Sequence, residues 1–339
     1  MFTETRIPVR LIYYKHTAGD ELNKWATPRP YKLEIIGPLS QQSVATPASV
    51  RHISNVSSLD LDTLPNNAMK GLAAFVALAV ASSAYATRTF TVTNNCAYTI
   101  WPAIYTDLNV GTSVPDQATG WEAAAGSTVS FSVPDDWKAG RIWGRTDCDF
   151  STNPGPTSCA TGGCNGGLEC DSATGTVGSS FDHLEIFELT RGQGVPPASV
   201  AEWTLGGSSG EDWYDVSLVD GFNIPMAITN NAGCSTASCP ANLNTDCPSE
   251  LALTSSGTTV GCKSACFANL DGNQADSGNC CSGSHNTAAT CPNSGVEYYS
   301  YFKNGCPDSY VYAYDESSGT ALWTCGSTLA ANYVLTFCP

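Results

Sequence analysis

The sequence predicts a mainly β protein: a β-sandwich with a disulfide-rich second domain containing short helices, and a small disulfide-stapled loop region. Many short segments alternate apolar and polar residues and are separated by clusters of Gly, Pro, Asn and Asp, as in sandwiches. Sixteen cysteines all lie between Cys96 and Cys338. An even, dense set of cysteines in an acidic chain indicates a disulfide framework made in an oxidising compartment.

The alternating segments are the predicted strands. The clearest are 88–93 and 127–133, where every second residue is apolar. Further strands are expected at 141–144, 183–189, 201–205, 213–218 and 333–337. The stretch from Cys234 to Cys306 is different, because it holds nine cysteines and two pieces compatible with short helices, 263–270 and 296–302. We therefore expect this stretch to form most of the second domain.

The start of the chain differs from the rest. Met69-Lys70 is followed by an apolar run at 71–81 and then by Ala84-Tyr85-Ala86. A basic start, a short apolar stretch and a small-residue exit are typical of a secretory signal peptide. The run is too short to span a bilayer comfortably, and a buried strand or helix is the alternative. Residues 1–68 then belong to an over-extended gene model or a long leader, and either predicts no stable fold there.

These patterns predict a division of the chain by residue range. We expect an unstructured extension or gene-model artefact at 1–68, a signal peptide at 69–86, and a folded part at 87–339. Within the folded part we expect a core sandwich (87–146, 183–238 and 307–339), a disulfide loop region (147–182) and a disulfide-rich domain (239–306).

Composition excludes several functions. Residues 87–339 carry 7 basic and 25 acidic residues, a net charge of −18, so phosphate backbones and anionic membranes would be repelled. Only four histidines are present and the cysteine spacings are irregular, which favours disulfides over metal sites. We expect no nucleic-acid partner, no membrane span, no metal and no cofactor, and we expect a monomer.

Several motifs occur in a fixed order from residue 89 to the C-terminus. They are Thr93-Asn94-Asn95-Cys96, Ile142-Trp143-Gly144-Arg145-Thr146-Asp147-Cys148, the run from Asp215 to Met226, Cys280-Cys281, Asn304-Gly305-Cys306-Pro307-Asp308 and Phe337-Cys338-Pro339. With the sixteen cysteines, this order resembles the thaumatin-like proteins. Two positions depart from that family: Gly163 stands where an acidic residue is usual, and Thr157 where glycine or phenylalanine is usual.

The resemblance implies a disulfide pairing that the sequence alone leaves open. By cysteine order, the implied pairs are Cys96–Cys338, Cys148–Cys159, Cys164–Cys170, Cys234–Cys325, Cys239–Cys306, Cys247–Cys262, Cys266–Cys280 and Cys281–Cys291.

The resemblance also implies an acidic cleft between the sandwich and the disulfide-rich domain, with Arg141, Glu202, Asp215, Asp220 and Asp315 as the matching residues. Independently, hydrolysis of a glycosidic bond generally needs one protonated and one ionised carboxyl group. Crowded carboxylates separate their pKa values, because like charges oppose simultaneous ionisation. We expect Glu202 to donate the proton and Asp215 to be its partner, with Asp220 as the competing choice. Arg141 and Asp315 would orient substrate and tune the charge.

Each of these residues also has an alternative role. Asp220 can be a turn former, Asp215 a solvated strand residue, and Arg141 part of a structural ion pair. The aromatic residues Trp203, Tyr214 and Phe222 are candidates for stacking on sugar rings, although such residues also form sandwich cores.

Two other chemistries have no sequence support. A serine nucleophile on a strand-to-helix elbow is not expected, and His183 is expected to be structural.

The sequence therefore predicts a secreted carbohydrate-active protein, located outside the cell or in the cell wall. We expect an endo-β-1,3-glucanase that hydrolyses cell-wall glucan, with β-1,3-glucan or a related polysaccharide as its partner. The alternative is a non-catalytic β-glucan-binding antifungal, defence or wall protein. A more remote alternative is an inhibitor of other hydrolases.

Overall fold

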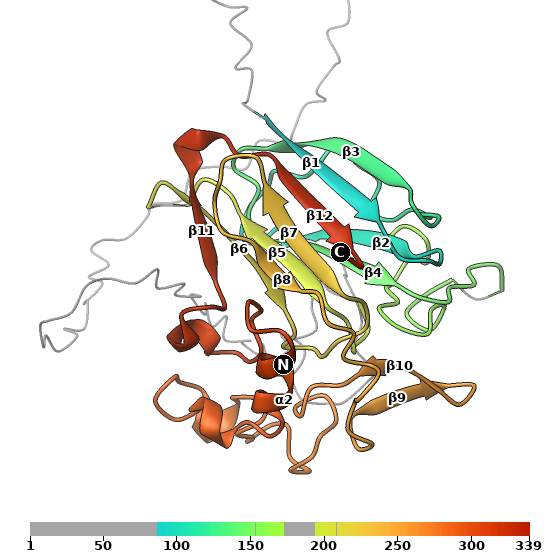
Figure 1. The fold of residues 1–339 in the computed structure, drawn as a ribbon, viewed down its shortest axis with the longest axis vertical. Helices are drawn as coiled ribbons and strands as arrows, with labels where there is room; N and C mark the ends of the chain where they lie inside the picture. The colour runs from blue at the N-terminus through green and yellow to red at the C-terminus, as the bar shows by residue number, and fades with distance from the viewer. Residues whose placement is uncertain (1–86, 153, 173–193, 208) are drawn as a thin grey trace, which may run out of the picture. The chain divides into compact units, whose positions relative to one another are not determined.

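Two five-stranded sheets dominate the part of the chain that the computed structural model describes, residues 87–152, 154–172, 194–207 and 209–339 (Figure 1). The first sheet has the order β3-β1-β12-β7-β8, with bounds Thr128–Pro134, Thr87–Asn94, Tyr333–Phe337, Met226–Asn230 and Ala237–Cys239. The second has the order β11-β6-β5-β4-β2, with bounds Trp323–Gly326, Glu211–Ser217, Val200–Thr204, Gly140–Arg145 and Trp101–Thr106. Neighbouring strands are antiparallel except β1 and β12, which are parallel.

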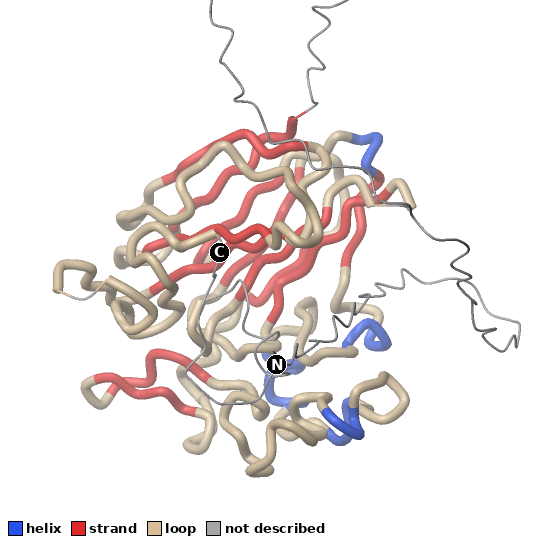
Figure 2. The backbone as a smooth tube through the Cα atoms, turned by 180° about the vertical axis from the view of Figure 1, so that it is seen from behind, coloured by secondary structure: helices blue, strands red, loops and turns tan. Residues whose placement is uncertain are grey.

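The segment between β8 and β11 has a different character. It holds a separate hairpin of β9 (Ala252–Ser255) and β10 (Thr258–Cys262) and the helix α2 (Tyr299–Gly305). Figure 2 shows how little helix accompanies the strands. The other helical pieces among the described residues are 3-10 turns: η2 (Gly283–His285), η3 (Asn293–Gly295) and η4 (Asp315–Ser318), and, after β11, η5 (Ser327–Leu329).

The two large sheets share one apolar core and so form a β-sandwich. Phe90 on β1 contacts Trp203 on β5, with ring centroids 5.1 Å apart, and Tyr214 on β6 contacts Tyr333 on β12 at 5.3 Å. All four side chains are buried. Because each sheet contributes alternate residues to this core, every other residue of a strand faces outward. The mainly β prediction is confirmed.

The eight disulfide bonds have the pairing that the family resemblance implies, from Cys96–Cys338 to Cys281–Cys291. Cys96–Cys338 joins residues 242 positions apart, next to the parallel pair β1 and β12. No cysteine among the described residues is free. Four of the bonds have at least one cysteine within residues 239–291, where the segment has little regular structure to hold it.

The loop region after β4 is organised around a buried arginine. Arg145 donates hydrogen bonds to the backbone carbonyls of Gly167 and Leu168, at 2.6 and 2.7 Å. Burial lowers its pKa to about 10. The departure from the family pattern at Gly163 also has a steric reason here. A Cβ atom at Gly163 would lie only 2.0 Å from the carbonyl oxygen of Pro156, so this packing excludes any side chain.

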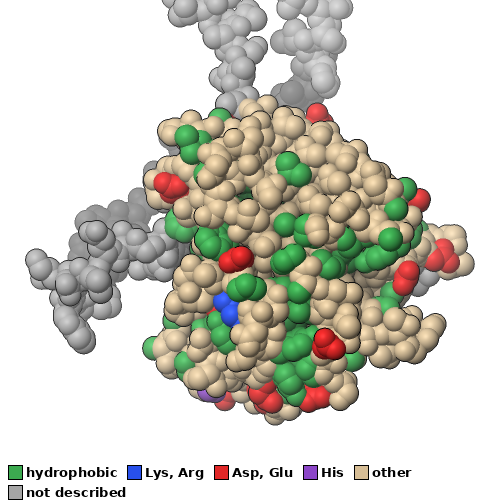
Figure 3. Space-filling view, in the orientation of Figure 1, with side chains coloured by type: hydrophobic (Ala, Val, Ile, Leu, Met, Phe, Trp, Pro, Cys, Tyr) green, Lys and Arg blue, Asp and Glu red, His purple; other side chains and the backbone are tan. Residues whose placement is uncertain are grey.

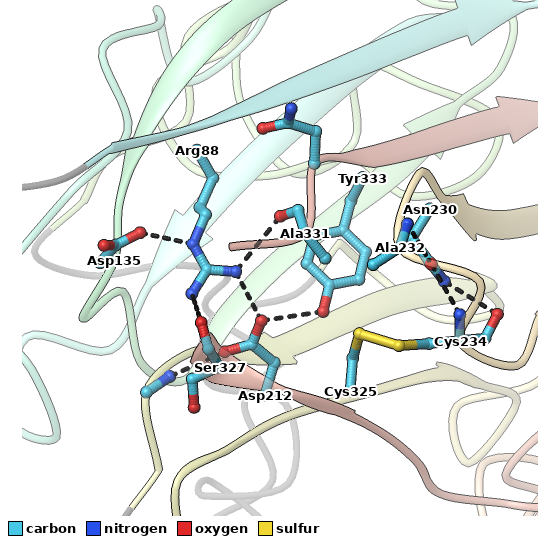
Figure 4. Close-up of polar contacts among 12 residues, drawn as sticks. Arg88, Asp135, Asp212, Asn230, Ala232, Cys234, Cys325, Ser327, Ala331 and Tyr333 are labelled. Carbon is cyan, nitrogen blue, oxygen red and sulfur yellow. Dashed lines mark hydrogen bonds and ion pairs between the residues drawn. A yellow bond between two sulfur atoms is a disulfide. The ribbon is translucent and has the colours of Figure 1, made fainter. Parts of the chain in front are cut away.

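A buried ion pair fastens the two sheets at one end (Figure 4). Arg88 on β1 donates from its terminal nitrogen to Asp212 on β6 at 2.7 Å, and its Nε contacts Asp135. The hydroxyl of Tyr333 donates to the same Asp212 oxygen at 3.0 Å. The backbone N–H of Gly206 satisfies the other oxygen at 3.0 Å. The carboxylate is therefore paired and fully hydrogen-bonded, as a buried charge requires.

Two details of the predicted elements differ from the structure. Residues 265–270 form turns rather than a helix, and Asn269 among them adopts a left-handed backbone with φ at 52°. The helix expected at 296–302 begins at Tyr299.

Some expectations fall beyond the part of the chain that the structure describes. The strand expected at 183–189, His183, and the segments 1–68 and 69–86 lie outside the described residues. The division of the folded part into subdomains stays a prediction.

Candidate active site

Three of the predicted site residues stand side by side on the second sheet. In the strand register, Arg141 on β4 is opposite Glu202 on β5, and Glu202 is opposite Asp215 on β6. Their chain neighbours Ile142, Trp203 and Tyr214 belong to the buried core. Because side chains alternate along a strand, Arg141, Glu202 and Asp215 all point to the outer face of the sheet. We call these three residues the cross-strand row.

An ion pair joins two members of the row. The Nε of Arg141 lies 2.6 Å from Oε1 of Glu202, and each side chain keeps about 28% of its surface exposed. Burial lowers the pKa of Arg141, but the negative charges of Glu202 and Asp220 outweigh it and the net shift is upward. Arg141 therefore stays charged, and Glu202 accepts its charge-assisted hydrogen bond.

Asp215, the third member, has a contrasting environment. It is only 8% exposed, and its Oδ1 has no hydrogen-bond partner among the described residues. Burial raises the pKa of this carboxyl well above its usual value, and the charges of Glu202 and Glu316 raise it further against the opposing effect of Arg141. The row thus combines an arginine-paired carboxylate with a buried carboxyl that favours its protonated form.

The structure adds two residues that the sequence did not single out. Tyr310 runs beside the end of β6, where its N–H donates to the Val216 carbonyl at 2.8 Å and its carbonyl accepts from Leu218 N–H at 2.7 Å. Burial, a hydrogen bond with Glu316 and the negative charges of Glu316, Asp215 and Glu202 raise the pKa of Tyr310 above its usual value.

Glu316, in η4, is exposed and acts electrostatically on both Asp215 and Tyr310. Its sequence signal is the adjacency of two acidic residues, Asp315-Glu316, of which the family resemblance matches only the first. Successive residues of a 3-10 turn point in different directions, and the sequence does not tell which of them faces the row.

A substrate-binding role for Asp315 does not fit the structure. Its side chain is completely buried. Oδ1 accepts from the Tyr299 hydroxyl at 2.8 Å, and Oδ2 accepts from Lys303 Nζ and Val311 N–H, both at 3.0 Å. All of these partners lie within residues 299–311, so the carboxylate serves this segment and is closed to substrate.

The expected sugar-stacking role of Trp203, Tyr214 and Phe222 is also wrong. These side chains are at most 2% exposed and belong to the main core. Trp203 stacks near Trp137 at 6.1 Å, and the Tyr214 hydroxyl donates to the Ser235 carbonyl. The alternative that they form the core of the sandwich is the one observed.

Asp220 lies near the row but not in it. It follows β6 in a turn closed by a hydrogen bond from Gly221 N–H to the Leu218 carbonyl at 2.9 Å. The turn requires glycine after the aspartate, since Gly221 has a φ of 92° and a Cβ there would lie 2.4 Å from the Cys262 carbonyl oxygen. Asp220 is partly exposed and its charge acts on Arg141.

The described ranges contain no group of three His, Cys, Asp or Glu side chains arranged to hold a metal ion. No helix within them has the length and apolar character needed to cross a membrane.

These features define a class of protein: a two-sheet β-sandwich held by eight disulfides, with an arginine and two acidic side chains in a row across the outer face of one sheet. The model of the Thaumatin family matches residues 94–339. The chain belongs to this family.

Named relatives cover most of this chain. "Pathogenesis-related thaumatin-like protein 3.5" of Cryptomeria japonica is 41% identical over 253 residues, which is 74% of this chain and 89% of that protein. "Glucan endo-1,3-beta-glucosidase" of Prunus avium is 40% identical over 261 residues, covering 74% and 90%. Among solved structures, the thaumatin-like xylanase inhibitor matches with a TM-score of 0.35 and 20% identity, over 74% of this chain and 99% of that one.

Proposed function

We propose that the protein is a secreted endo-β-1,3-glucanase that hydrolyses cell-wall glucan at the cross-strand row. The observation that carries the proposal is the pairing of Glu202 and Asp215. They are opposite residues on neighbouring strands, yet only Glu202 is ion-paired with Arg141. Hydrolysis of a glycosidic bond needs such a pair, one carboxyl holding a proton and the other ionised.

The environments favour roles opposite to those expected from the sequence. Asp215 is the proton donor, because burial and the neighbouring Glu202 charge raise its pKa. Glu202 is the base or nucleophile, because its carboxyl group is ion-paired with Arg141. In this scheme the proton of Asp215 passes to the glycosidic oxygen as the bond to the anomeric carbon breaks. The carboxylate of Glu202 activates water or attacks the anomeric carbon, and water supplies the group that replaces the leaving sugar.

The relatives and the disulfides support this proposal. One relative with 40% identity carries the name of an endo-1,3-β-glucosidase, and another is named as pathogenesis-related. Eight disulfides are typical of a protein that matures in an oxidising compartment. Secretion and a place outside the cell or in the wall follow from the proposed activity on wall glucan.

The test is release of reducing sugar from a linear β-1,3-glucan by the purified protein. Asp215→Asn and Glu202→Gln serve as the catalytic variants, and Asp116→Asn, at an exposed position, as the matched control. Cleavage by the wild type and the control, but by neither catalytic variant, is the expected result. If the protein is retained on insoluble glucan but cleaves none, its function is binding rather than hydrolysis. If it neither binds nor cleaves glucan, the proposal is overturned.

A further inference from the structure

A hollow lies beside the cross-strand row, between the turn after β6 and the disulfide-rich segment. Its lining includes the aromatic residues Phe267, Tyr299 and Tyr312 and the polar residues Asp220, Asn279 and Glu297. The volume of about 50 Å³ is several times the roughly 10–15 Å³ that one water molecule needs on the same measure. Figure 3 shows hydrophobic side chains gathered across the middle of one face of the molecule, with acidic side chains scattered over that face.

Two chain segments connect the proposed active site with the hollow. Asp220, which lines the hollow, comes after β6 (Glu211–Ser217), the strand that carries Asp215. Tyr310 is hydrogen-bonded to Val216 and Leu218 at the end of β6, and the residues that follow it, Val311 and Tyr312, line the hollow. A chain molecule bound across the row can therefore extend toward the hollow.

The lining suits one face of a sugar ring. Phe267 and Tyr299 are partly exposed aromatic residues, and the C–H face of a pyranose is apolar. The polar lining residues supply groups that bind hydroxyls. Asn279 and Glu297 hold each other through two hydrogen bonds, Asn279 Nδ2 to Glu297 Oε1 at 3.0 Å and Glu297 N–H to Asn279 Oδ1 at 2.8 Å. Glu297 is exposed, so its carboxylate can accept bonds from hydroxyl donors.

The wall is also rigid before any ligand arrives. The buried carboxylate of Asp315 accepts the Tyr299 hydroxyl at 2.8 Å and the Val311 N–H at 3.0 Å. Tyr299 packs edge-on against Tyr312 with ring centroids 5.5 Å apart. The disulfide Cys266–Cys280 fixes the chain next to Phe267 and Asn279. Such fixed side chains lose little conformational freedom on binding.

We propose that this hollow is a sugar-binding subsite that holds one glucosyl unit of the same glucan chain, at a distance from the bond that is cleaved, with Phe267 as its aromatic platform. The proposal rests on the proposed function and extends it. With this subsite the protein prefers glucan chains long enough to occupy both the cross-strand row and the hollow. It also gives Asp315 a positioning role, since this carboxylate holds the wall without touching the sugar.

The test removes the aromatic ring of Phe267. Phe267→Leu keeps an apolar side chain in place, and Phe267→Tyr restores the ring. Phe150→Leu is the matched control, because Phe150 is also partly exposed but lies in the loop region against Trp101 and Arg145. The full chain is tested by gel retardation in soluble β-1,3-glucan, with linear β-1,3-glucan oligosaccharides of increasing length as competitors.

For the wild type, Phe267→Tyr and Phe150→Leu, the affinity should rise in a step once the oligosaccharide spans the row and the hollow. Phe267→Leu should lose about fivefold in affinity for the long oligosaccharides, the scale of one aromatic contact, and nothing for the short ones. Equal affinities of Phe267→Leu and wild type at every length would overturn the subsite and leave the proposed function standing. Failure of the wild type to bind any of these glucans would overturn both.

Discussion

Glu202 and Asp215 are opposite each other on β5 and β6, yet Arg141 lies 2.6 Å from Glu202 while Asp215 has an unpartnered buried oxygen among the described residues. Two neighbouring acids on one sheet face are thereby made chemically unequal. The difference arises because the strand register places Arg141 opposite Glu202, and because Asp215 is buried. It needs no special backbone geometry at either residue.

The first prediction concerns the pH dependence of stability. The folded-state pKa of Asp215 lies above the value of about 3.9 for an unfolded aspartate. Between these two values the native state binds more protons than the unfolded state, so the wild type loses stability as the pH rises. Asp215→Asn cannot ionise. We expect its free energy of unfolding, relative to the wild type, to increase as the pH rises from about 4, measured by urea unfolding at several pH values.

The control for this prediction is Asp116→Asn, at an exposed position. Its difference from the wild type should stay flat over the same pH range. A flat difference for Asp215→Asn as well would show that the buried carboxyl does not hold its proton in the folded state.

The second prediction concerns catalysis. Glu202→Gln keeps the size of the side chain and an oxygen for the Arg141 hydrogen bond, but it removes the carboxylate. We expect a folded protein, checked by circular dichroism, whose hydrolysis of linear β-1,3-glucan falls roughly 10²–10⁴-fold, the usual contribution of such a group. Glu122→Gln, at an exposed position, should retain full activity. Normal hydrolysis by Glu202→Gln would remove Glu202 from the mechanism.

Strand alternation explains which parts of the fold could be predicted. β1 and β3 have buried Phe90, Val92, Phe131 and Val133 separated by Thr and Ser, so their period of two is visible in the sequence. β2 (Trp101–Thr106) was missed because nearly all its residues are buried on both faces and it contains a proline. β7 (Met226–Asn230) is also hard to predict, because its first three residues are all buried. Strands buried on both sides lack the alternation that marks a strand.

The same alternation could have corrected part of the site. Trp203 follows Glu202 and Tyr214 precedes Asp215, so a strand necessarily points each aromatic residue away from its acidic neighbour. Their core position was therefore predictable from the sequence. The burial of Asp315 was not, because it depends on Lys303 and Tyr299, which come from another element. The unequal states of Glu202 and Asp215 likewise depend on tertiary burial.

The third prediction concerns the buried pair of Arg88 and Asp212. Asp212 is completely buried and accepts hydrogen bonds from Arg88 and Tyr333. Asp212→Asn leaves the arginine charge with a weaker partner, and Arg88→Met leaves the carboxylate uncompensated. We expect each change to lower the free energy of unfolding by about 3–5 kcal/mol in chemical denaturation. The double variant should lose less than the sum of the single losses, because it leaves no fully buried charge without a partner; Asp135, the other partner of Arg88, is partly exposed. Additive losses would show that the two groups do not interact.

The last prediction compares two disulfides of very different loop length. Cys96–Cys338 spans 242 positions, whereas Cys164–Cys170 spans 6. Cross-linking removes more freedom from the unfolded chain when the loop is long, so removing the first bond should destabilise the protein by about 3 kcal/mol more than removing the second. The variants are Cys96→Ala with Cys338→Ala, and Cys164→Ala with Cys170→Ala, compared by chemical denaturation. A larger loss for Cys164–Cys170 would mean that local packing around Arg145, next to that bond, outweighs the restriction of the unfolded chain.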